Sequence, residues 1–220
     1  SNLAFQLTFF EPMIRILICL CLVAVTLGGM AQNLNRFYEN GKVGYRNTSG
    51  ETVVDAHFDA GSEFQEGFAI VLVGSKRGYI DHSGKLAIPA QFEDAAPFCE
   101  GLASVSLGGK YGYITTSGHW HITNEFQKAE SFSEGFALVS RNGKSFFIDG
   151  NGQQTFNLFF DQGRSFTEGF AAVKIGRWGY IDRSGKFVIK CQYDDAFPFT
   201  DGIAVVLEKG IRRYIDPKNH

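Results

Sequence analysis

The sequence has no strong excess of charge of either sign. Its 21 Lys and Arg residues nearly balance its 23 Asp and Glu residues, so the formal net charge is −2. A nucleic-acid-binding domain normally shows a basic patch or stripe, and attachment to anionic lipid normally uses a polybasic cluster. The chain has neither, which predicts no nucleic-acid partner and no membrane partner for its folded part.

The motifs of common enzymes are also missing. The sequence contains no phosphate-binding Gly loop, no G-x-S-x-G, no H-E-x-x-H and no paired C-x-x-C. His119 and His121 flank Trp120, but two exposed ligands make a weak metal site. We expect Trp120 and Ile122 to point inward and the histidines to form a solvated face. The sequence therefore predicts a protein that is not an enzyme and uses no metal or cofactor.

Only one long apolar run occurs, at residues 16–27, with Arg15 before it and Gly29-Met30-Ala31 after it. A basic flank, a short apolar stretch and small residues at the cleavage site are typical of a secretory signal peptide. The run is shorter than the roughly 20 residues that cross a bilayer comfortably. We expect cleavage near Ala31, so that 1–31 are upstream residues and signal peptide and 32–220 are an exported protein. That protein would be periplasmic, cell-surface or secreted.

The sequence is rich in internal repetition, which is the mark of a repeat architecture. An acidic-Gly-apolar-Ala tetrapeptide returns every 33 or 34 residues. Aromatic and Gly positions return in the same register. The tetrapeptides begin at Glu66, Glu100, Glu134, Glu168 and Asp201. The aromatic ladders run through Tyr45, Tyr79, Tyr113, Phe147, Tyr180 and Tyr214, and through Phe64, Phe98, Phe132, Phe166 and Phe199.

One repeat, 67–100, reads as a small β-structure. Apolar strands are expected at 68–73, 77–81 and 86–90, with turns between them and an aromatic-bearing connection at 91–100. A three-stranded unit is too small to be stable alone, so neighbouring copies must pack together. The Ala that ends each tetrapeptide indicates close approach of neighbouring units, and the Phe residues of the connections are expected to fill the gaps between them. The predicted fold is all-β: a tandem array of about six 34-residue meanders, with an open twisted array favoured and a closed propeller-like ring as the alternative.

The residues also resemble a known family. Arg77-Gly-Tyr-Ile-Asp81, Ser83-Gly-Lys85 and Phe98-Cys-Glu-Gly-Leu-Ala103 are similar to the bacterial WG (KWG) repeat, and the clearest copy contains Trp178-Gly179. The resemblance covers nearly all of 34–220. It implies a binding or scaffolding module, often found at the bacterial envelope. The Trp-Gly pair itself occurs only at Trp178-Gly179, which weakens the case for a ligand site shared by all copies.

Several carboxylates recur at fixed positions in the repeat. Four of them precede turns and are expected to cap those turns rather than to bind calcium: Asp81, Asp149, Asp182 and Asp216. Those that begin the tetrapeptides occupy equivalent environments, whereas a catalytic pair needs two different ones; we expect them to be turn residues. The pairs Glu93-Asp94 and Asp194-Asp195 form a solvated edge or an acidic rim for a cationic partner.

Two cysteines, Cys99 and Cys191, follow the predicted signal peptide. Export permits a disulfide. The two residues lie three repeats apart, however, and at different positions in the repeat. We expect two separate thiols.

The tyrosine ladder is the best candidate for an exposed binding stripe, because Tyr combines a ring with a polar tip. Core packing is the alternative for the same residues. We expect a non-catalytic module that binds a protein or polysaccharide of the cell envelope. An envelope glycan hydrolase and a purely structural spacer are the alternatives. The candidate stripe comprises Tyr45, Tyr79, Tyr113, Tyr180 and Tyr214.

Overall fold

The computed structural model describes residues 33–218, which form β-strands joined by turns and loops and contain no helix. The strands make six antiparallel sheets that follow one another along the chain. The expected all-β array of about six repeats is therefore confirmed. The predicted signal peptide and its cleavage site lie outside the described residues.

The second sheet shows the repeating unit. It contains β4 (Ala60–Gly61), β5 (Phe68–Val73), β6 (Lys76–Asp81) and β7 (Leu86–Phe92), hydrogen-bonded in that order. Strands β5 to β7 are the expected meander. Strand β4 was not predicted: it is a two-residue strand in the connection from the previous repeat, and it pairs with β5 through Ala60–Leu72 and Gly61–Val71.

The other sheets vary this plan. Among residues 33–218, the first sheet has no short strand, the sixth has no last strand, and the fourth has no regular last strand. The first sheet contains β1 (Asn35–Glu39), β2 (Lys42–Arg46) and β3 (Thr52–Phe58), and the third β8 (Asp94–Ala95), β9 (Leu102–Leu107), β10 (Lys110–Thr115) and β11 (Trp120–Phe126). The fourth contains β12 (Lys128–Ala129), β13 (Phe136–Arg141) and β14 (Lys144–Asp149), and the fifth β15 (Gln162–Gly163), β16 (Phe170–Ile175), β17 (Arg177–Asp182) and β18 (Phe187–Tyr193). The sixth contains β19 (Asp195–Ala196), β20 (Ala204–Glu208) and β21 (Ile211–Ile215).

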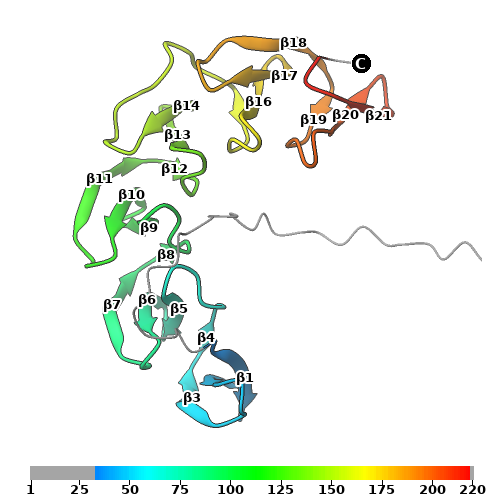
Figure 1. The fold of residues 1–220 in the computed structure, drawn as a ribbon. Coiled ribbons are helices and arrows are strands. Elements are labelled where there is room, and N and C mark those ends of the chain that lie inside the picture. The colour runs from blue at the N-terminus through cyan, green and yellow to red at the C-terminus, as the bar shows by residue number, and fades with distance from the viewer. Residues whose placement is uncertain (1–32, 219–220) are drawn as a thin grey trace, which may run out of the picture.

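The sheets are arranged as an open arc (Figure 1). The last strand of a sheet, such as β7, β11 or β18, lies on the outer side of the arc, and the short strands β8, β12 and β19 lie on the inner side. The first and sixth sheets stand at opposite ends and do not pair with each other. The open array, rather than the closed ring, is the arrangement found.

The hydrophobic core lies between consecutive sheets. Tyr79, Phe92 and Phe98, for example, pack with Ala103 and Val105 of the next sheet. The ring of Phe98 lies 4.9 Å from that of Tyr79, and the same aromatic pairing recurs in the other repeats. The Phe residues of the connections therefore fill the gaps between sheets, as expected. The Ala positions are fully buried, at Ala69, Ala103, Ala137, Ala171 and Ala204.

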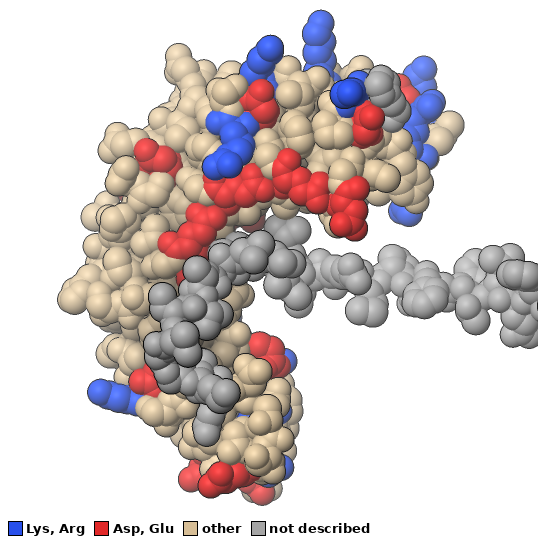
Figure 2. All heavy atoms as spheres, viewed as in Figure 1, with Lys and Arg blue, Asp and Glu red and all other residues tan. Residues whose placement is uncertain are grey.

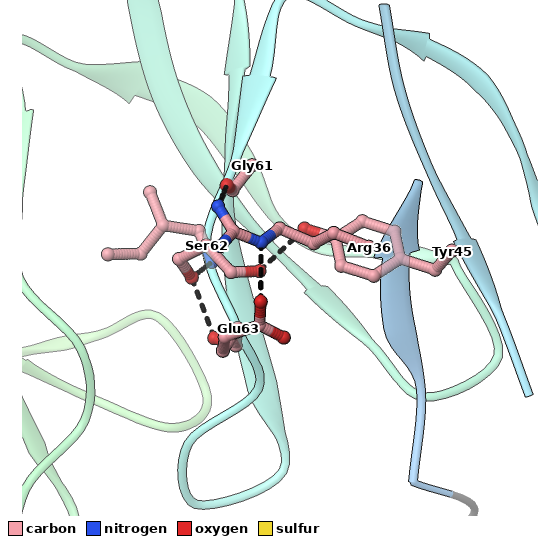
Figure 3. A network of polar contacts seen from close by, with 6 residues as sticks. Arg36, Tyr45, Gly61, Ser62 and Glu63 are labelled. Carbon is pink, nitrogen blue, oxygen red and sulfur yellow. Dashed lines mark hydrogen bonds and ion pairs between the residues drawn. The ribbon is translucent and has the colours of Figure 1, made fainter. Parts of the chain in front are cut away.

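Polar contacts add to this packing at the first boundary (Figure 3). Arg36 of β1 reaches the loop after β4, where its Nε lies 2.6 Å from Glu63 Oε1 and its Nη1 donates to the carbonyl of Gly61 at 2.8 Å. Tyr45 donates its hydroxyl to the carbonyl of Ser62 at 2.9 Å. The first sheet is thus joined to the second by side chains that reach across the boundary.

The hairpin carboxylates cap their turns, as predicted. Asp81 accepts hydrogen bonds from the backbone N–H groups of Ser83 and Lys85 at 2.8 and 3.2 Å. Asn47 does the same in the first repeat. The following Gly84 has φ +80°, and a Cβ there would collide with Val54 of the previous sheet. The turn therefore requires Gly for both its conformation and its packing.

The Trp position of the repeat is the position that Trp178 occupies in the fifth repeat. The Gly that follows this position has a different role. A Cβ on Gly112 would lie 2.6 Å from the backbone N of Asn124, and one on Gly78 or Gly179 would meet the last strand of its sheet at the same distance. In the fourth repeat this Gly is replaced by Phe146, and no regular last strand follows β14. The steric requirement explains the irregular segment after β14, because the Phe146 side chain occupies the space that the strand would need.

Candidate functional site

The most regular polar feature of the molecule is a carboxylate ladder that joins each repeat to the next. Glu66 accepts hydrogen bonds from the backbone N–H groups of Glu100 and Gly101, both at 2.9 Å. Each further carboxylate binds the equivalent turn one repeat later. These contacts join Glu100 to Gly135, Glu134 to Gly169, and Glu168 to Asp201 and Gly202.

The backbone at these positions is left-handed, with φ between 48° and 55° at the four glutamates and Asp201. That conformation is unfavourable for a residue with a Cβ, and Gly would adopt it freely. A carboxylate has nevertheless been kept at every rung of the ladder. We attribute this to the hydrogen bonds between repeats, which a Gly could not make. The expected role as turn residues is confirmed, and the link to the next repeat is a role that sequence reasoning missed.

The loops that carry the ladder are acidic. The five loops between a short strand and the next long strand contain seven Asp or Glu residues and one basic residue, Arg164. Figure 2 shows a continuous acidic band along the concave edge in the upper part of the arc. Arg164 is itself paired with Asp195, at 3.1 Å between Nη2 and Oδ1. Glu63 is likewise paired with Arg36, so the acidic band belongs to the later repeats, where charge of one sign favours a cationic partner.

The acidic pairs of the connections are mostly occupied within the fold. Glu93 accepts hydrogen bonds from the backbone N–H groups of Gly108 and Gly109. The N–H of Gly109 is the main reason why the pKa of Glu93 is below its usual value. Asp94 accepts a hydrogen bond from the hydroxyl of Tyr111 at 2.9 Å. The Glu93-Asp94 pair was expected to be a solvated edge or an acidic rim, but both residues have contacts within their own sheet and ion pairs with Lys76 and Arg77 of the previous sheet.

The expected exposed tyrosine stripe is wrong for four of its five members. Tyr45, Tyr79, Tyr113 and Tyr180 are fully buried between sheets. Their hydroxyls donate to backbone carbonyls 17 residues later, at 2.7 to 2.9 Å. Burial raises the pKa of all four phenols. Tyr214, in β21 of the sixth sheet, is 66% exposed. The alternative of core packing is therefore correct for the ladder.

Each residue of the histidine pair has a polar contact within the fold. His119 Nδ1 contacts Ser117 Oγ at 3.0 Å, and His121 Nε2 contacts the carbonyl of Gly150 at 2.8 Å. Within residues 33–218, no three His, Cys, Asp or Glu side chains come together as metal ligands. Ile122 points inward as expected, whereas Trp120 is 37% exposed and does not. In this outer strand the third and seventh residues, Ile122 and Phe126, are buried, whereas the first residue is exposed.

The Trp position of the repeat lies at the boundary between sheets. Trp178 is 5% exposed. The guanidinium of Arg164 lies 5.1 Å from its ring centre and 4.8 Å from that of Phe197 in the next sheet. The indole thus fills the space between the fifth and sixth sheets beneath a cation. The equivalent residues of the other repeats are Val43, Arg77, Tyr111, Ser145 and Arg212.

The two cysteines are separate thiols, as predicted. No disulfide joins Cys99 to Cys191. Cys99 is buried and its Sγ lies 3.1 Å from Gln65 Nε2, whereas Cys191 is half-buried, and burial raises the pKa of its thiol.

Across the described part of the chain, no helix has the length and apolar character needed to span a membrane.

Solved structures with a similar fold are found at low sequence identity. Hsv2 of Kluyveromyces lactis is 10% identical, with a TM-score of 0.52, and the match covers 86% of this chain and 72% of that protein. A structure titled as a eukaryotic initiation factor is 11% identical, with a TM-score of 0.55, over 84% of this chain and 60% of that one. These are similarities to propeller-like structures, and at such identities they concern the fold alone. No curated protein matches the chain in sequence.

A sequence family matches most of the array. The family described as "WG containing repeat" matches five consecutive segments, at 44–76, 78–111, 111–144, 146–177 and 178–210. The matched segments include the ladder, the aromatic columns and the turns described above. They cover well over half of the chain, which therefore belongs to the WG-repeat family.

Proposed function

We propose that this protein is a non-catalytic binding or scaffolding module that acts outside the cytoplasm. Its partner would be a cell-envelope protein that carries basic residues. The observation that carries the proposal is the acidic inner edge, which runs over several repeats on an open arc. The N-terminal leader-like segment supports export.

The geometry of the array supports this role in two ways. An open arc offers a long concave surface, which repeat proteins commonly use for binding. The carboxylate ladder fixes the spacing between neighbouring loops, because each glutamate is hydrogen-bonded to the turn one repeat later. A row of charges held at fixed spacing can match a row of opposite charges on an extended or repetitive partner.

The test is capture of a partner from the envelope fraction of the source cell, followed by charge neutralisation. The variant E100Q/E134Q/D201N removes three inner-edge charges. Gln keeps an oxygen for the backbone N–H, and Asn tolerates the left-handed conformation at position 201. We expect the affinity of this variant to be roughly tenfold lower than that of the unmodified protein and less sensitive to added salt, because fewer charges remain to be screened.

The matched control is E39Q/D55N/E125Q, which removes three exposed charges that lie outside the inner loops. This control should bind as the unmodified protein does. Equal binding by all three proteins, with folding verified by circular dichroism, would refute the acidic edge as the contact surface. Failure of the unmodified protein to enrich any partner would refute the binding function.

A further inference from the structure

The outward face of the sixth sheet, which points away from the fifth sheet, is largely apolar. In this sheet Val205 lies opposite Tyr214 and Leu207 lies opposite Arg212, so these four side chains share one face. Ile203 precedes them on the same face, because side chains alternate along a strand. Tyr214 is 66% exposed and Ile203 is 51% exposed, whereas Val205 and Leu207 are half-buried.

The fifth sheet shows what normally covers such a face. The corresponding side chains there are Phe170, Ala172 and Tyr180, which pack in one cluster with Ala204 and Val206 of the sixth sheet. Inside the array, a face of this kind is therefore covered by another sheet of the same chain. On the sixth sheet the same face is exposed, and an exposed apolar patch marks a site of protein contact.

The first sheet, at the opposite end of the arc, has a different outward face. It carries Asn35, Phe37 and Arg46 at the positions where the second sheet buries an Ala, a Val and an Ile. The guanidinium of Arg46 lies 3.9 Å from the ring centre of Phe37 and covers it. Repeat arrays need a polar outer face on their end units. The first sheet has one and the sixth does not.

Opposite charges lie at the two ends of the apolar face of the sixth sheet. Asp201 precedes β20, and Arg212 lies beside the β20–β21 turn; both are exposed. The counterpart of Asp201 in the fifth repeat, Glu168, reaches forward to the following sheet. A two-fold axis that crosses the strands between two copies would bring Asp201 of each copy opposite Arg212 of the other. The face is therefore complementary to itself in charge as well as in apolar character.

We propose that two copies of this chain form a symmetric dimer through the outward faces of their sixth sheets. Tyr214 and Val205 would pack at the centre, between two pairs of Asp201 and Arg212. A head-to-tail assembly is disfavoured, because it would bury Arg46 of the first sheet against an apolar face. The inference does not depend on the proposed binding function, since dimer formation needs no other partner.

The test is sedimentation velocity of the mature protein, 32–220, which contains all six sheets. Between about 1 and 500 μM we expect a reversible monomer–dimer equilibrium with a Kd on the order of 10 μM, as for a small interface. The variant I203T/Y214T should weaken it at least about tenfold. Thr suits a β-strand, so the fold should be kept, which circular dichroism verifies.

The matched control is V73T/I175T, which makes the same kind of change at two apolar residues that are 48% and 47% exposed outside this face. The control should associate as the unmodified protein does. An unmodified protein that stays monomeric at every concentration would overturn the proposal. Undiminished association by folded I203T/Y214T would overturn it as well.

Two further variants test the geometry of the dimer. R212E places a like charge opposite Asp201 and should weaken association by about tenfold, most strongly at low salt. N35R adds a charge to the outward face of the first sheet and should leave the dimer unchanged. Weaker association by N35R, or assemblies that grow beyond two copies, would indicate a head-to-tail contact and contradict the proposal. Normal association by R212E would contradict the two-fold pairing.

Discussion

The carboxylate of Glu66 binds the backbone N–H of Gly101, so a side chain of one repeat holds the main chain of the next. Replacement of Glu66 by Ala removes this contact and the one to Glu100, while the backbone stays left-handed. We expect a loss of about 2 kcal/mol in the free energy of unfolding, as for hydrogen bonds to a charged group. Urea denaturation measures it.

Glu66→Gly is the informative comparison for that variant. It removes the same carboxylate but also relieves the left-handed conformation, worth about 1 kcal/mol. Its net cost should therefore be about 1 kcal/mol. Equal stability of the Ala variant and the unmodified protein would show that the ladder contributes nothing to stability.

The Gly after the Trp position should be intolerant of any side chain. In Gly112→Ala the new Cβ would lie 2.6 Å from the backbone of Asn124. We expect a loss of about 3 kcal/mol, at the upper end of overpacking effects. Gly150→Ala is the control, because a Cβ there meets nothing within 4 Å and the Gly does not have positive φ. Thermal melting that ranks the two variants equally would contradict the steric explanation of the fourth repeat.

The buried tyrosine hydroxyls should contribute measurably to stability. Tyr113→Phe leaves the ring in place but removes the bond to the carbonyl of Glu130 at 2.7 Å. A loss of about 1 kcal/mol is expected, since the carbonyl would lose a buried donor. Tyr214→Phe, at an exposed position of the same column, should change nothing. Urea unfolding of both variants at one pH tests the contrast.

The hairpin carboxylates should make the array sensitive to acid. The Ser83 hydroxyl lowers the pKa of Asp81 below its ordinary value of 3.8, and the Ser184 hydroxyl does the same for Asp182. A carboxyl with a lowered folded-state pKa stabilises the protein above pH 3.8, and this contribution is lost as the pH falls through the folded-state pKa. The stability of the unmodified protein should therefore decrease below about pH 4.

The variant D81N/D182N isolates that effect. Asn can cap the same turn, as Asn47 does in the first repeat. The variant should resemble the unmodified protein near neutral pH and lose less stability between pH 4 and pH 2. Parallel acid-induced losses in the two proteins, followed by circular dichroism, would place the acid sensitivity elsewhere.

Much of the fold could be predicted because the repeat aligns residues with equivalent surroundings. The strand 68–73 was readable from its apolar run, and the turn at Gly84 from its composition. Strand β4 was not, because Ala60–Gly61 is too short to show any periodicity. The fourth repeat has no regular last strand because Phe146 replaces the Gly that precedes this strand in other repeats. The sequence alone does not show that Gly is required there, because the requirement follows from the short distance between a Cβ on Gly112 and the backbone of Asn124.

The candidate site was harder to predict than the fold. A tyrosine column is compatible with a surface stripe and with a core, and only the position of the next sheet decides between them. The recurrence of Glu66 and its equivalents was plain in the sequence. That recurrence shows that the positions are alike, but it carries no information on which backbone each carboxylate reaches.

The ladder gives the array a polarity. Every rung is a carboxylate that points toward the later repeat and one or two backbone N–H groups that face the earlier one. An array shortened from its later end would expose a carboxylate, which water solvates readily. One shortened from its earlier end would expose a left-handed turn without its acceptor. As far as the ladder is concerned, shortening the array at its later end should therefore cost less stability than shortening it at its earlier end.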